Sequence, residues 1–325
     1  MIGEDFKTSK AIIYAPLAGI SDSPARKIAV RHGADMTVSE LISSEGVIRH
    51  SHRTLALAKF DNLERPIGLQ LFGANPETMA EAAKIISSFD PDFIDLNFGC
   101  PVRKVVGKNG GSSILQNLNL FKEIIRKVVK ATDLPVTVKM RSGWDSGSLV
   151  YIEAGKIAQD CGAAAITLHP RTKAQGFAGR AEWSQIAELK EAVDIPVIGN
   201  GDIRDVVDVK RMFDETGCDG VAVARGALGN PWIFSKTAEH LNNEAASCGP
   251  DVYEIARTMK EHLALIVEFR GEVIGVMQFR KFFSWYLRGM TVKELKFKAF
   301  HAATREEMMR LIDELETFKK NPPML

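Results

Sequence analysis

Short apolar segments rich in β-branched residues recur eight times between residues 11 and 224, and a stretch with helical spacing follows each one. Turn residues bound every segment, and several are entered through proline, which the first residue of a strand tolerates. Strands that alternate with helices are typical of right-handed βαβ units and a parallel sheet. The predicted strands are Ala11–Ala15, Met36–Ser39, Ile67–Phe72, Phe93–Asn97, Val136–Met140, Ala165–His169, Val197–Gly199 and Gly220–Ala224.

Eight consecutive βα units predict an α/β protein built as a closed (β/α)8 barrel, the TIM barrel. A doubly wound open sheet is the alternative, but no G-x-G-x-x-G motif follows the first strand. Several helices carry start signals, either an N-cap residue before proline or a capping box. These signals are Ser23-Pro24, Asn75-Pro76, Asp251 with Glu254, and Thr304 with Glu307.

The character of the chain changes near residue 242. Residues 242–250 are small, polar and turn-like, and they predict a linker between a barrel domain of residues 1–241 and a second domain of residues 251–325. Only helical patterns follow the linker, which predicts a small C-terminal helical bundle. The expected helices cover about 251–270, 273–287, 292–302 and 304–319.

Composition adds little to this outline and excludes several classes of protein. The formal net charge is +1, and the four cysteines lie far apart without a C-x-x-C pair. This argues against a zinc cluster or a disulfide framework, and it fits a reducing cytoplasm. The first ten residues do not resemble a signal peptide, and no apolar run approaches the ~20 residues of a membrane span. We expect a cytoplasmic monomer with no metal and no membrane segment.

Polar and glycine residues follow nearly every predicted strand, although the strand interiors are apolar. The active site of a (β/α)8 barrel lies at these carboxyl ends. A purely structural barrel has no reason to place amide, cationic, thiol and imidazole groups on one rim, so the pattern predicts an enzyme. The rim residues are Pro16–Gly19, Glu40, Gln70, Asn97, Cys100, Lys139, Arg141, His169, Arg171, Asn200–Asp202, Arg225 and Gly226.

The turns after the last two strands favour a phosphate site. Asn200-Gly201-Asp202 and Arg225-Gly226-Ala227 offer glycine backbone amides, and Arg225 adds a charged fork. Each turn alone is more often a simple tight turn. Both together, after strands seven and eight of a barrel, favour a bound phosphate.

Lys139 occupies an inward-facing strand position, where an unpaired charge is costly. Its partner is either a carboxylate, Glu40 or Asp95, or negative charge on a bound cofactor ring. His169 ends strand six and is either a satisfied core histidine or a ligand contact.

Cys100 lies in a Gly-Cys-Pro turn directly after a strand, beside the basic residues Arg103, Lys104 and Lys108. A thiol in this setting can give or take a proton. Cys161 and Cys218 are better explained as small apolar residues.

Several of these segments together resemble the tRNA-dihydrouridine synthase family, and the C-terminal part is similar to its bacterial B-type branch. The resemblance runs from about residue 11 to 318, and the Gly-Cys-Pro motif is highly specific. The matching segments are Ala15–Gly19, Asn97–Pro101, Lys139–Trp144, Gly199–Asp202, Arg225–Ala227, Asn230–Phe234, Arg280-Lys281 and Ser284–Leu287.

The resemblance implies FMN bound non-covalently at the barrel mouth and NADPH as the reductant. Along the flavin ring it implies Pro16, Leu17, Ala18, Gln70, Lys139 and His169; at the phosphate end it implies Asn200, Gly201, Asp202, Ala224 and Arg225. It also implies hydride transfer from the flavin to C6 of uracil and protonation of C5 by Cys100. Asn97, Arg141 and Arg171 are the expected substrate contacts within the barrel.

Three positions depart from the family pattern. Leu17 replaces a common methionine, which is a volume-conserving change. Pro170 replaces a usual glycine, so the loop 170–180 and the contact of Arg171 are open to change. Ala224 replaces a common glycine, and its methyl is tolerable if φ is negative.

The C-terminal helices carry a local positive charge. Residues 280–310 hold eight basic and three acidic side chains, with Trp285 and Tyr286 among them. A solvated helical face over an aromatic core would look the same. Beside a uracil-reducing barrel the pattern favours an RNA surface for the D-loop region of tRNA. The expected RNA contacts are Arg280, Lys281, Lys296 and Lys298.

Two other functions are open at this point. A flavin barrel could act on a free small molecule, as dihydroorotate dehydrogenases do, but it would not need the basic helical domain. A non-catalytic tRNA-binding protein could retain the barrel, but it would not need the thiol or the flavin site.

Overall fold

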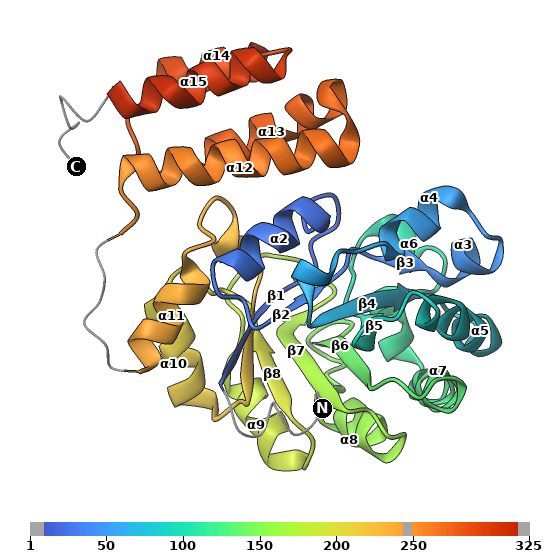
Figure 1. Ribbon diagram of the computed structural model, residues 1–325. Coiled ribbons are helices and arrows are strands. Elements are labelled where there is room, and N and C mark those ends of the chain that lie inside the picture. The colour runs from blue at the N-terminus through green and yellow to red at the C-terminus, as the bar shows by residue number, and fades with distance from the viewer. Residues whose placement is uncertain (1–9, 243–248, 318–325) are drawn as a thin grey trace.

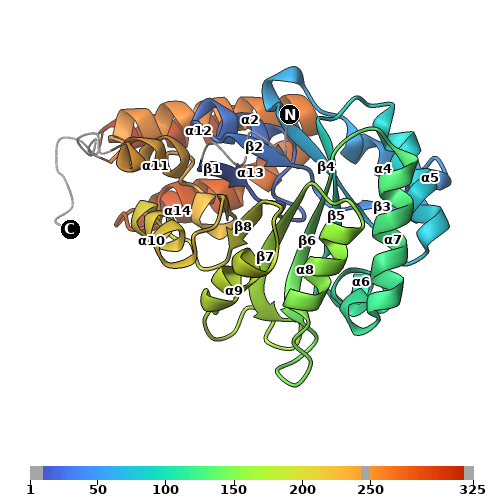
Figure 2. The same ribbon diagram turned by 90° about the horizontal axis from the view of Figure 1, so that it is seen from below.

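The computed structural model describes residues 10–242 and 249–317. Within this part of the chain, eight parallel strands close into a barrel, because β2 pairs with both β1 and β4 while β9 pairs back onto β1. The predicted (β/α)8 barrel is therefore confirmed and the open sheet is wrong (Figures 1 and 2). The strands are β1 (Ala11–Tyr14), β2 (Met36–Val38), β4 (Ile67–Phe72), β5 (Phe93–Phe98), β6 (Val136–Gly143), β7 (Ala165–Thr172), β8 (Val197–Asn200) and β9 (Gly220–Val223).

One short strand was not expected from the sequence. β3 (Ile42–Ser43) lies beyond the end of β2 and pairs with the last residues of β4. Two apolar layers stabilise the barrel, one between strands and helices and a smaller one inside the barrel. Alternate residues of β1 belong to different layers, since Ile12 packs outward and Ile13 inward.

Helices surround the barrel in sequence order (Figures 1 and 2). The N-cap at Asn75 is confirmed, because its Oδ1 accepts a hydrogen bond of 2.8 Å from the Thr78 amide. The N-cap at Ser23 is wrong: Asp22 caps that helix, and the Ser23 hydroxyl donates to Glu64. The barrel helices are α2 (Ser23–Arg31), α3 (Ser44–Ile48), α4 (His52–Leu55), α5 (Pro76–Ser87), α6 (Arg103–Val106), α7 (Leu118–Ala131), α8 (Tyr151–Asp160), α9 (Ser184–Ala192), α10 (Val206–Thr216) and α11 (Ile233–Leu241).

Residues 251–317 are mainly helical, as expected, and have their own apolar cluster. The capping box of Thr304 and Glu307 is confirmed, with reciprocal hydrogen bonds of 3.1 and 3.2 Å. At Asp251 only half of the box forms, because the Glu254 carboxylate accepts from the Trp232 indole instead. The helices are α12 (Val252–Arg270), α13 (Glu272–Tyr286), α14 (Lys293–His301) and α15 (Arg305–Thr317).

The division of the chain at a 242–250 linker stays a prediction. Residues 243–248 lie outside the described residues, as do 1–9 and 318–325.

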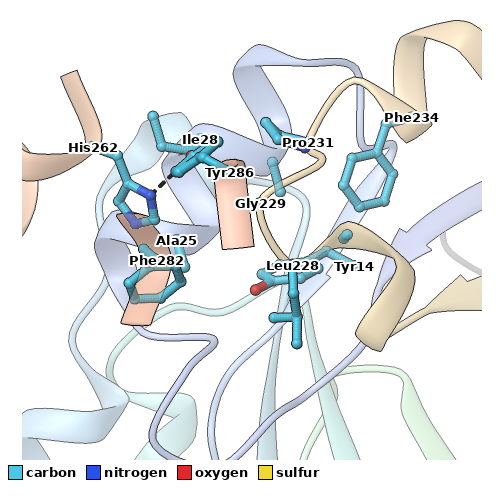
Figure 3. Close-up of a pocket in the computed structure, with 12 residues that line it drawn as sticks. Tyr14, Ala25, Ile28, Leu228, Gly229, Pro231, Phe234, His262, Phe282 and Tyr286 are labelled. Atoms are coloured by element: carbon cyan, nitrogen blue, oxygen red, sulfur yellow. Dashed lines mark hydrogen bonds between the residues drawn. The ribbon is translucent and has the colours of Figure 1, made fainter. Parts of the chain in front are cut away.

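The C-terminal helices pack on the barrel through α2, with α12 lying above it in Figure 1. A small cavity of about 20 Å³ lies at this junction, and Tyr14 of β1 lines it together with Phe282 and Tyr286 of α13 (Figure 3). His262 Nδ1 lies 3.0 Å from the Tyr286 hydroxyl. Burial lowers the pKa of His262 to about 3, and the charge of Lys281 contributes. The imidazole is therefore neutral at physiological pH.

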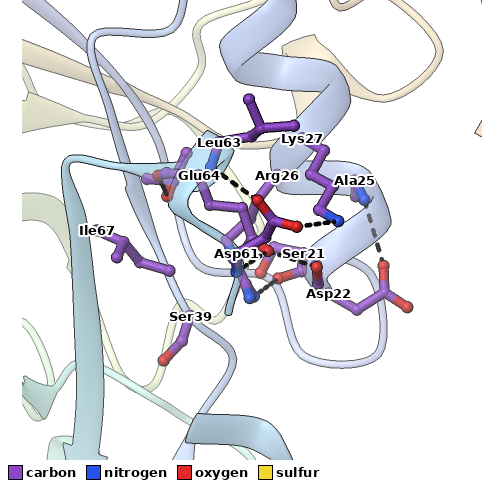
Figure 4. A network of polar contacts seen from close by, with 12 residues as sticks. Ser21, Asp22, Ala25, Arg26, Lys27, Ser39, Asp61, Leu63, Glu64 and Ile67 are labelled. Atoms are coloured by element: carbon purple, nitrogen blue, oxygen red, sulfur yellow. Dashed lines mark hydrogen bonds and ion pairs between the residues drawn. The ribbon is translucent and has the colours of Figure 1, made fainter. Parts of the chain in front are cut away.

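A buried ion pair anchors α2 to the segment before β4 (Figure 4). Arg26 Nε donates to Glu64 Oε2 at 2.7 Å, and both side chains are almost fully buried. Glu64 also accepts from the Ser23 hydroxyl and from the Asp61 amide. This network fixes α2, on which the C-terminal helices rest.

Candidate active site

A cavity of about 950 Å³ opens at the carboxyl ends of the barrel strands. Cys100, all eleven predicted cofactor residues and the three predicted substrate residues of the barrel line it. Side chains that are far apart in the sequence thus converge because parallel strands of a closed barrel end on one rim.

Hydrogen bonds from three directions hold the turn at Cys100, directly after β5. Asn97 Oδ1 accepts from the Cys100 amide at 2.9 Å, and the Ser112 hydroxyl donates to the Cys100 carbonyl at 3.0 Å. Arg141 Nε donates to the Gly99 carbonyl at 2.8 Å. Gly111 is required behind the turn, because it has φ +61° and a Cβ there would lie 2.6 Å from the Cys100 carbonyl oxygen. The thiol is therefore carried on a well-fixed backbone.

Burial raises the pKa of the Cys100 thiol above its ordinary value. The Val102 amide and the charges of Arg141 and Lys139 oppose this shift without reversing it. The cations that act on the thiol are thus on β6 and not in the 103–108 segment that the sequence suggested. At neutral pH the thiol is protonated, which is the form that a proton donor needs.

A relay of side chains runs from this turn into the barrel. Asn97 Nδ2 donates to Gln70 Oε1 at 3.0 Å, and Gln70 Nε2 donates to Asp95 Oδ2 at 2.5 Å. Thr137 donates to the other Asp95 oxygen at 2.6 Å. Burial raises the pKa of Asp95 to about 6. Because a carboxylate can only accept, Asp95 fixes the amide orientation of Gln70 and, through it, that of Asn97.

Lys139 is not ion-paired with either expected carboxylate. Its Nζ donates to Asn200 Oδ1 at 3.0 Å, while Glu40 accepts from the Gly19 amide and Asp95 is held in the relay. Burial lowers the pKa of Lys139 to about 8, and the charge of Asp95 opposes the shift. The ammonium group therefore lines the cavity with its charge incompletely neutralised, which favours an anionic ligand.

Asp202 lies between two arginines at the end of β8. Its carboxylate accepts from Arg171 at 2.7 Å, from Arg225 at 3.3 Å and from the Ala181 amide at 2.8 Å. Burial raises its pKa, but these contacts outweigh burial and leave the pKa below its usual range. A phosphate here would meet the backbone of this turn, because the carboxylate itself repels an anion.

Backbone conformation constrains both glycine turns, the one after β8 and the one after β9. Gly201 has φ +125°, and a Cβ there would lie 2.8 Å from the His169 ring. Ala224 has φ −106°, and at this negative value its methyl group is tolerated in place of the usual glycine. The Arg225 side chain is 53% exposed and lies over the Phe177 ring at 5.2 Å.

His169 is neutral. Burial, followed by the charge of Lys139 and of three arginines, lowers its pKa to about 2. Its Nε2 lies 3.3 Å from Arg171 Nη1, and because arginine only donates, Nε2 accepts and the proton resides on Nδ1.

Arg171 is buried and holds the loop after β7, where it donates to the Ala178 and Gly179 carbonyls. Pro170 lies within β7 itself, opposite a register shift in β6 at residues 141–143. An irregular ladder tolerates the missing amide proton of proline. The Arg171 guanidinium therefore already binds the loop after β7, and a substrate contact would have to share it with these hydrogen bonds.

The four basic residues expected to bind RNA lie outside the cavity and contact the protein. Arg280 donates to the Ala302 carbonyl, and Lys281 donates to the Gly19 carbonyl at 2.6 Å. Lys296 lies 3.5 Å from the Met290 carbonyl. Lys298 pairs with Glu294 at 3.1 Å and Glu314 at 3.8 Å. Glu314 lies just beyond the 280–310 segment, so the sequence count overstated the free positive charge.

Two arginines that the sequence did not assign to the site line the cavity. Arg288 follows α13, and Arg204 follows β8; both are exposed. Among the described residues, neither guanidinium has a hydrogen-bonding or ionic partner. The place of Arg288 in this cavity was not visible in the sequence, because it depends on how the C-terminal helices pack on the barrel.

The fold and the cavity define a (β/α)8-barrel enzyme with a protonated thiol, a buried lysine and two glycine turns at its mouth. The model of the dihydrouridine synthase family matches residues 13–322, and the chain belongs to this family.

Curated relatives agree with the family. The tRNA-dihydrouridine synthase B of Pasteurella multocida is 35% identical over 94% of this chain and 93% of its own length. A probable tRNA-dihydrouridine synthase of Rickettsia conorii is 38% identical over 88% of this chain and 87% of its own.

Solved structures with low identity share the fold. Histamine dehydrogenase from Rhizobium sp. 4-9 has a TM-score of 0.58 at 12% identity, over 96% of this chain and 62% of that one. Morphinone reductase has a TM-score of 0.51 at 14% identity, over 75% and 88%. Among the described helices, none is both long and apolar enough to cross a membrane. No group of three or more potential metal-binding side chains occurs among the described residues.

Proposed function

We propose that this enzyme reduces uridines in tRNA to 5,6-dihydrouridine, with FMN as the bound cofactor and NADPH as the reductant. The observation that carries the proposal is the protonated thiol of Cys100, held on a fixed turn in the same cavity as Lys139 and the two glycine turns. The family and the names of the curated relatives support the reduction of uridine in tRNA.

The residues present fit FMN. The cavity of about 950 Å³ is large enough for a cofactor together with a substrate base. Pro16, Leu17 and Ala18 would contact the ring, and Lys139 would supply positive charge to it. Gly201 and Arg225 offer amides and a guanidinium to the phosphate. When bound, the flavin supplies hydride transfer from NADPH to C6 of the uracil.

Cys100 completes the reduction by donating its proton to C5. Conjugation with the C4 carbonyl places negative charge on C5 and O4 once C6 has been attacked, and carbon protonation needs a positioned acid. The raised pKa keeps the thiol protonated until then. Arg141 and Lys139 stabilise the thiolate that remains.

Replacing Arg225 with alanine is expected to weaken FMN binding by roughly tenfold or more, since a charge-assisted contact of ~1.5–3 kcal/mol is lost. The measurement is quenching of FMN fluorescence on titration with apoprotein. Arg211→Ala is the matched control, because Arg211 is similarly exposed but lies on α10 away from the cavity. Equal FMN affinity in the two variants would place the phosphate elsewhere.

The C-terminal helices are expected to supply RNA affinity, with Arg288 contributing more than Lys298. Arg288→Glu should weaken binding of unmodified tRNA roughly tenfold, whereas Lys298→Glu should change it less because Lys298 is already paired with two carboxylates. Fluorescence anisotropy at two salt concentrations measures both. A larger loss for Lys298→Glu would favour the surface on α14 that the sequence suggested.

Cellular evidence would come from tRNA itself. Dihydrouridine mapped in tRNA from cells that lack this protein should disappear from at least one position. Unchanged dihydrouridine at every position would contradict the proposed function.

A further inference from the structure

A second cleft lies beside the active cavity, between the barrel and α12, with a volume of about 420 Å³. Ala18 lines the active cavity and the next residue, Gly19, lines this cleft, so the chain at Gly19 forms the wall between the two. Its amide donates to the Glu40 carboxylate, and its carbonyl accepts from Lys281 at 2.6 Å. The wall is therefore fixed from the barrel and from α13, and the cleft is a feature of both parts of the chain.

Most charged groups in this cleft are already paired. Arg26 is bound by Glu64, and Asp22 accepts from Arg270 at 3.3 Å and from Gln278 at 2.8 Å. These contacts join α2 to the C-terminal helices. They leave the deeper part of the cleft nearly neutral.

Arg53 and Lys59 are the two cations of this cleft whose charge is not neutralised by a neighbouring side chain of the described residues. Both line the cleft and are exposed, and among the described residues neither side chain has a hydrogen-bonding or ionic partner. They lie on α4 and just after the short 3-10 helix that follows it, in a segment, 49–59, that contains no acidic residue. The outer edge of the cleft is therefore positive and suits an anion.

The part of the cleft formed by α12 carries an exposed aromatic ring. Phe269, near the end of α12, is 42% exposed, and the Arg270 guanidinium lies 4.7 Å from its ring centre. The Arg270 Nε atom is buried and has no hydrogen-bond partner within the described structure. An aromatic face beside cations is the arrangement on which nucleic-acid bases stack.

We propose that this cleft binds a nucleotide of the RNA strand that flanks the uridine being reduced, with its base against Phe269 and its phosphate near Arg53 and Lys59. The inference rests on the proposed function, since it places the neighbour of a uracil held in the active cavity. A strand that inserts one base there can continue past the Gly19 wall into this cleft. In this cleft the barrel supplies positive charge through Arg53 and Lys59, and α12 supplies a ring for stacking through Phe269. A nucleotide offers both a phosphate and a base, so it can use both groups.

The test is charge reversal of both cations, Arg53→Glu with Lys59→Glu, in the full-length protein loaded with FMN. With unmodified tRNA transcript, the half-saturating tRNA concentration should rise about tenfold or more while the limiting rate stays the same. The slope of log affinity against log salt should become shallower by about one to two. Flavin reduction by NADPH should be unaffected.

Two further variants make the experiment specific. Arg126→Glu with Lys130→Glu makes the same charge change on the exposed face of α7 and should leave tRNA affinity near the parental value. Phe269→Leu keeps an apolar side chain but removes the ring, and it should weaken tRNA binding at least about fivefold.

The possible results separate the two proposals. If the parent reduces tRNA uridines but the Arg53/Lys59 variant behaves like the α7 control, the cleft assignment is overturned and the proposed function stands. If the variant instead raises the half-saturating NADPH concentration, the cleft binds the dinucleotide and the assignment is also overturned. A parent that binds tRNA through the cleft without reducing it would contradict the proposed function alone.

Discussion

Replacing Cys100 with alanine is expected to slow oxidation of the reduced enzyme by tRNA by about 10²–10⁴-fold, the range typical of a lost general acid. Reduction by NADPH should proceed at a near-parental rate, because no proton from the thiol is needed in that half of the reaction. Anaerobic stopped-flow at the flavin absorbance band separates the two halves. The large effect follows from the fixed position of the thiol and from its raised pKa.

Cys161→Ala is the matched control. Cys161 ends α8, where its Sγ lies 3.6 Å from the Lys122 carbonyl and away from the cavity. It should leave both half-reactions unchanged. Parental oxidation of the Cys100→Ala enzyme by tRNA would show that this thiol is structural. The proton would then have to come from another group on the rim.

Glu64→Gln is expected to reduce the free energy of unfolding by about 3–5 kcal/mol, because it leaves the buried Arg26 guanidinium without a counter-charge. The glutamine has nearly the same shape, so packing is preserved. Urea unfolding followed by circular dichroism measures the change. FMN binding by the folded fraction should persist, since neither residue lines the active cavity.

Glu77→Gln provides the comparison for this ion pair. Glu77 pairs with Lys127 on the surface, and exposed pairs contribute little. The double variant Arg26→Met with Glu64→Leu should recover part of the stability, because it removes both buried charges. If Glu64→Gln were no more destabilising than Glu77→Gln, the buried pair would not anchor α2.

The barrel could be predicted because its signals are local. Apolar runs between turn residues gave all eight strands, and Ile67–Phe72 has the predicted ends. β6 and β7 run three residues further than predicted, to Gly143 and Thr172. Polar residues extend these strands because they pair with the neighbouring strand through backbone hydrogen bonds. A pattern of apolar residues cannot predict that pairing.

The site could be predicted as a set of residues but not as a network. The predicted catalytic, cofactor and substrate residues of the barrel all line one cavity, because strand ends meet on one rim, whereas the predicted rim residues Gly19 and Glu40 line the neighbouring cleft. The role of Asp95 in orienting Gln70 and Asn97 was missed, since it requires knowledge of which side chains face each other across β4 and β5. Of the two partners open for Lys139, the carboxylate is excluded by the structure, in which Nζ donates to Asn200.

The C-terminal helices were the hardest part to interpret from sequence. A count of charges along 280–310 could not include Glu314, which approaches Lys298 only after α14 and α15 pack together. Nor could it show that Arg288 faces the barrel mouth. Such long-range docking is also what forms the cleft of Arg53 and Phe269.

The central claim is that this protein adds two hydrogens across the C5–C6 bond of uridine in tRNA. The most direct measurement incubates the purified, FMN-loaded protein with NADPH and an unmodified tRNA transcript, then analyses the digested nucleosides by mass spectrometry. We expect dihydrouridine to accumulate with time and in proportion to the NADPH consumed, and not to accumulate with the Cys100→Ala enzyme. NADPH consumption by an FMN-loaded parent that leaves every uridine of the transcript unreduced would contradict the account.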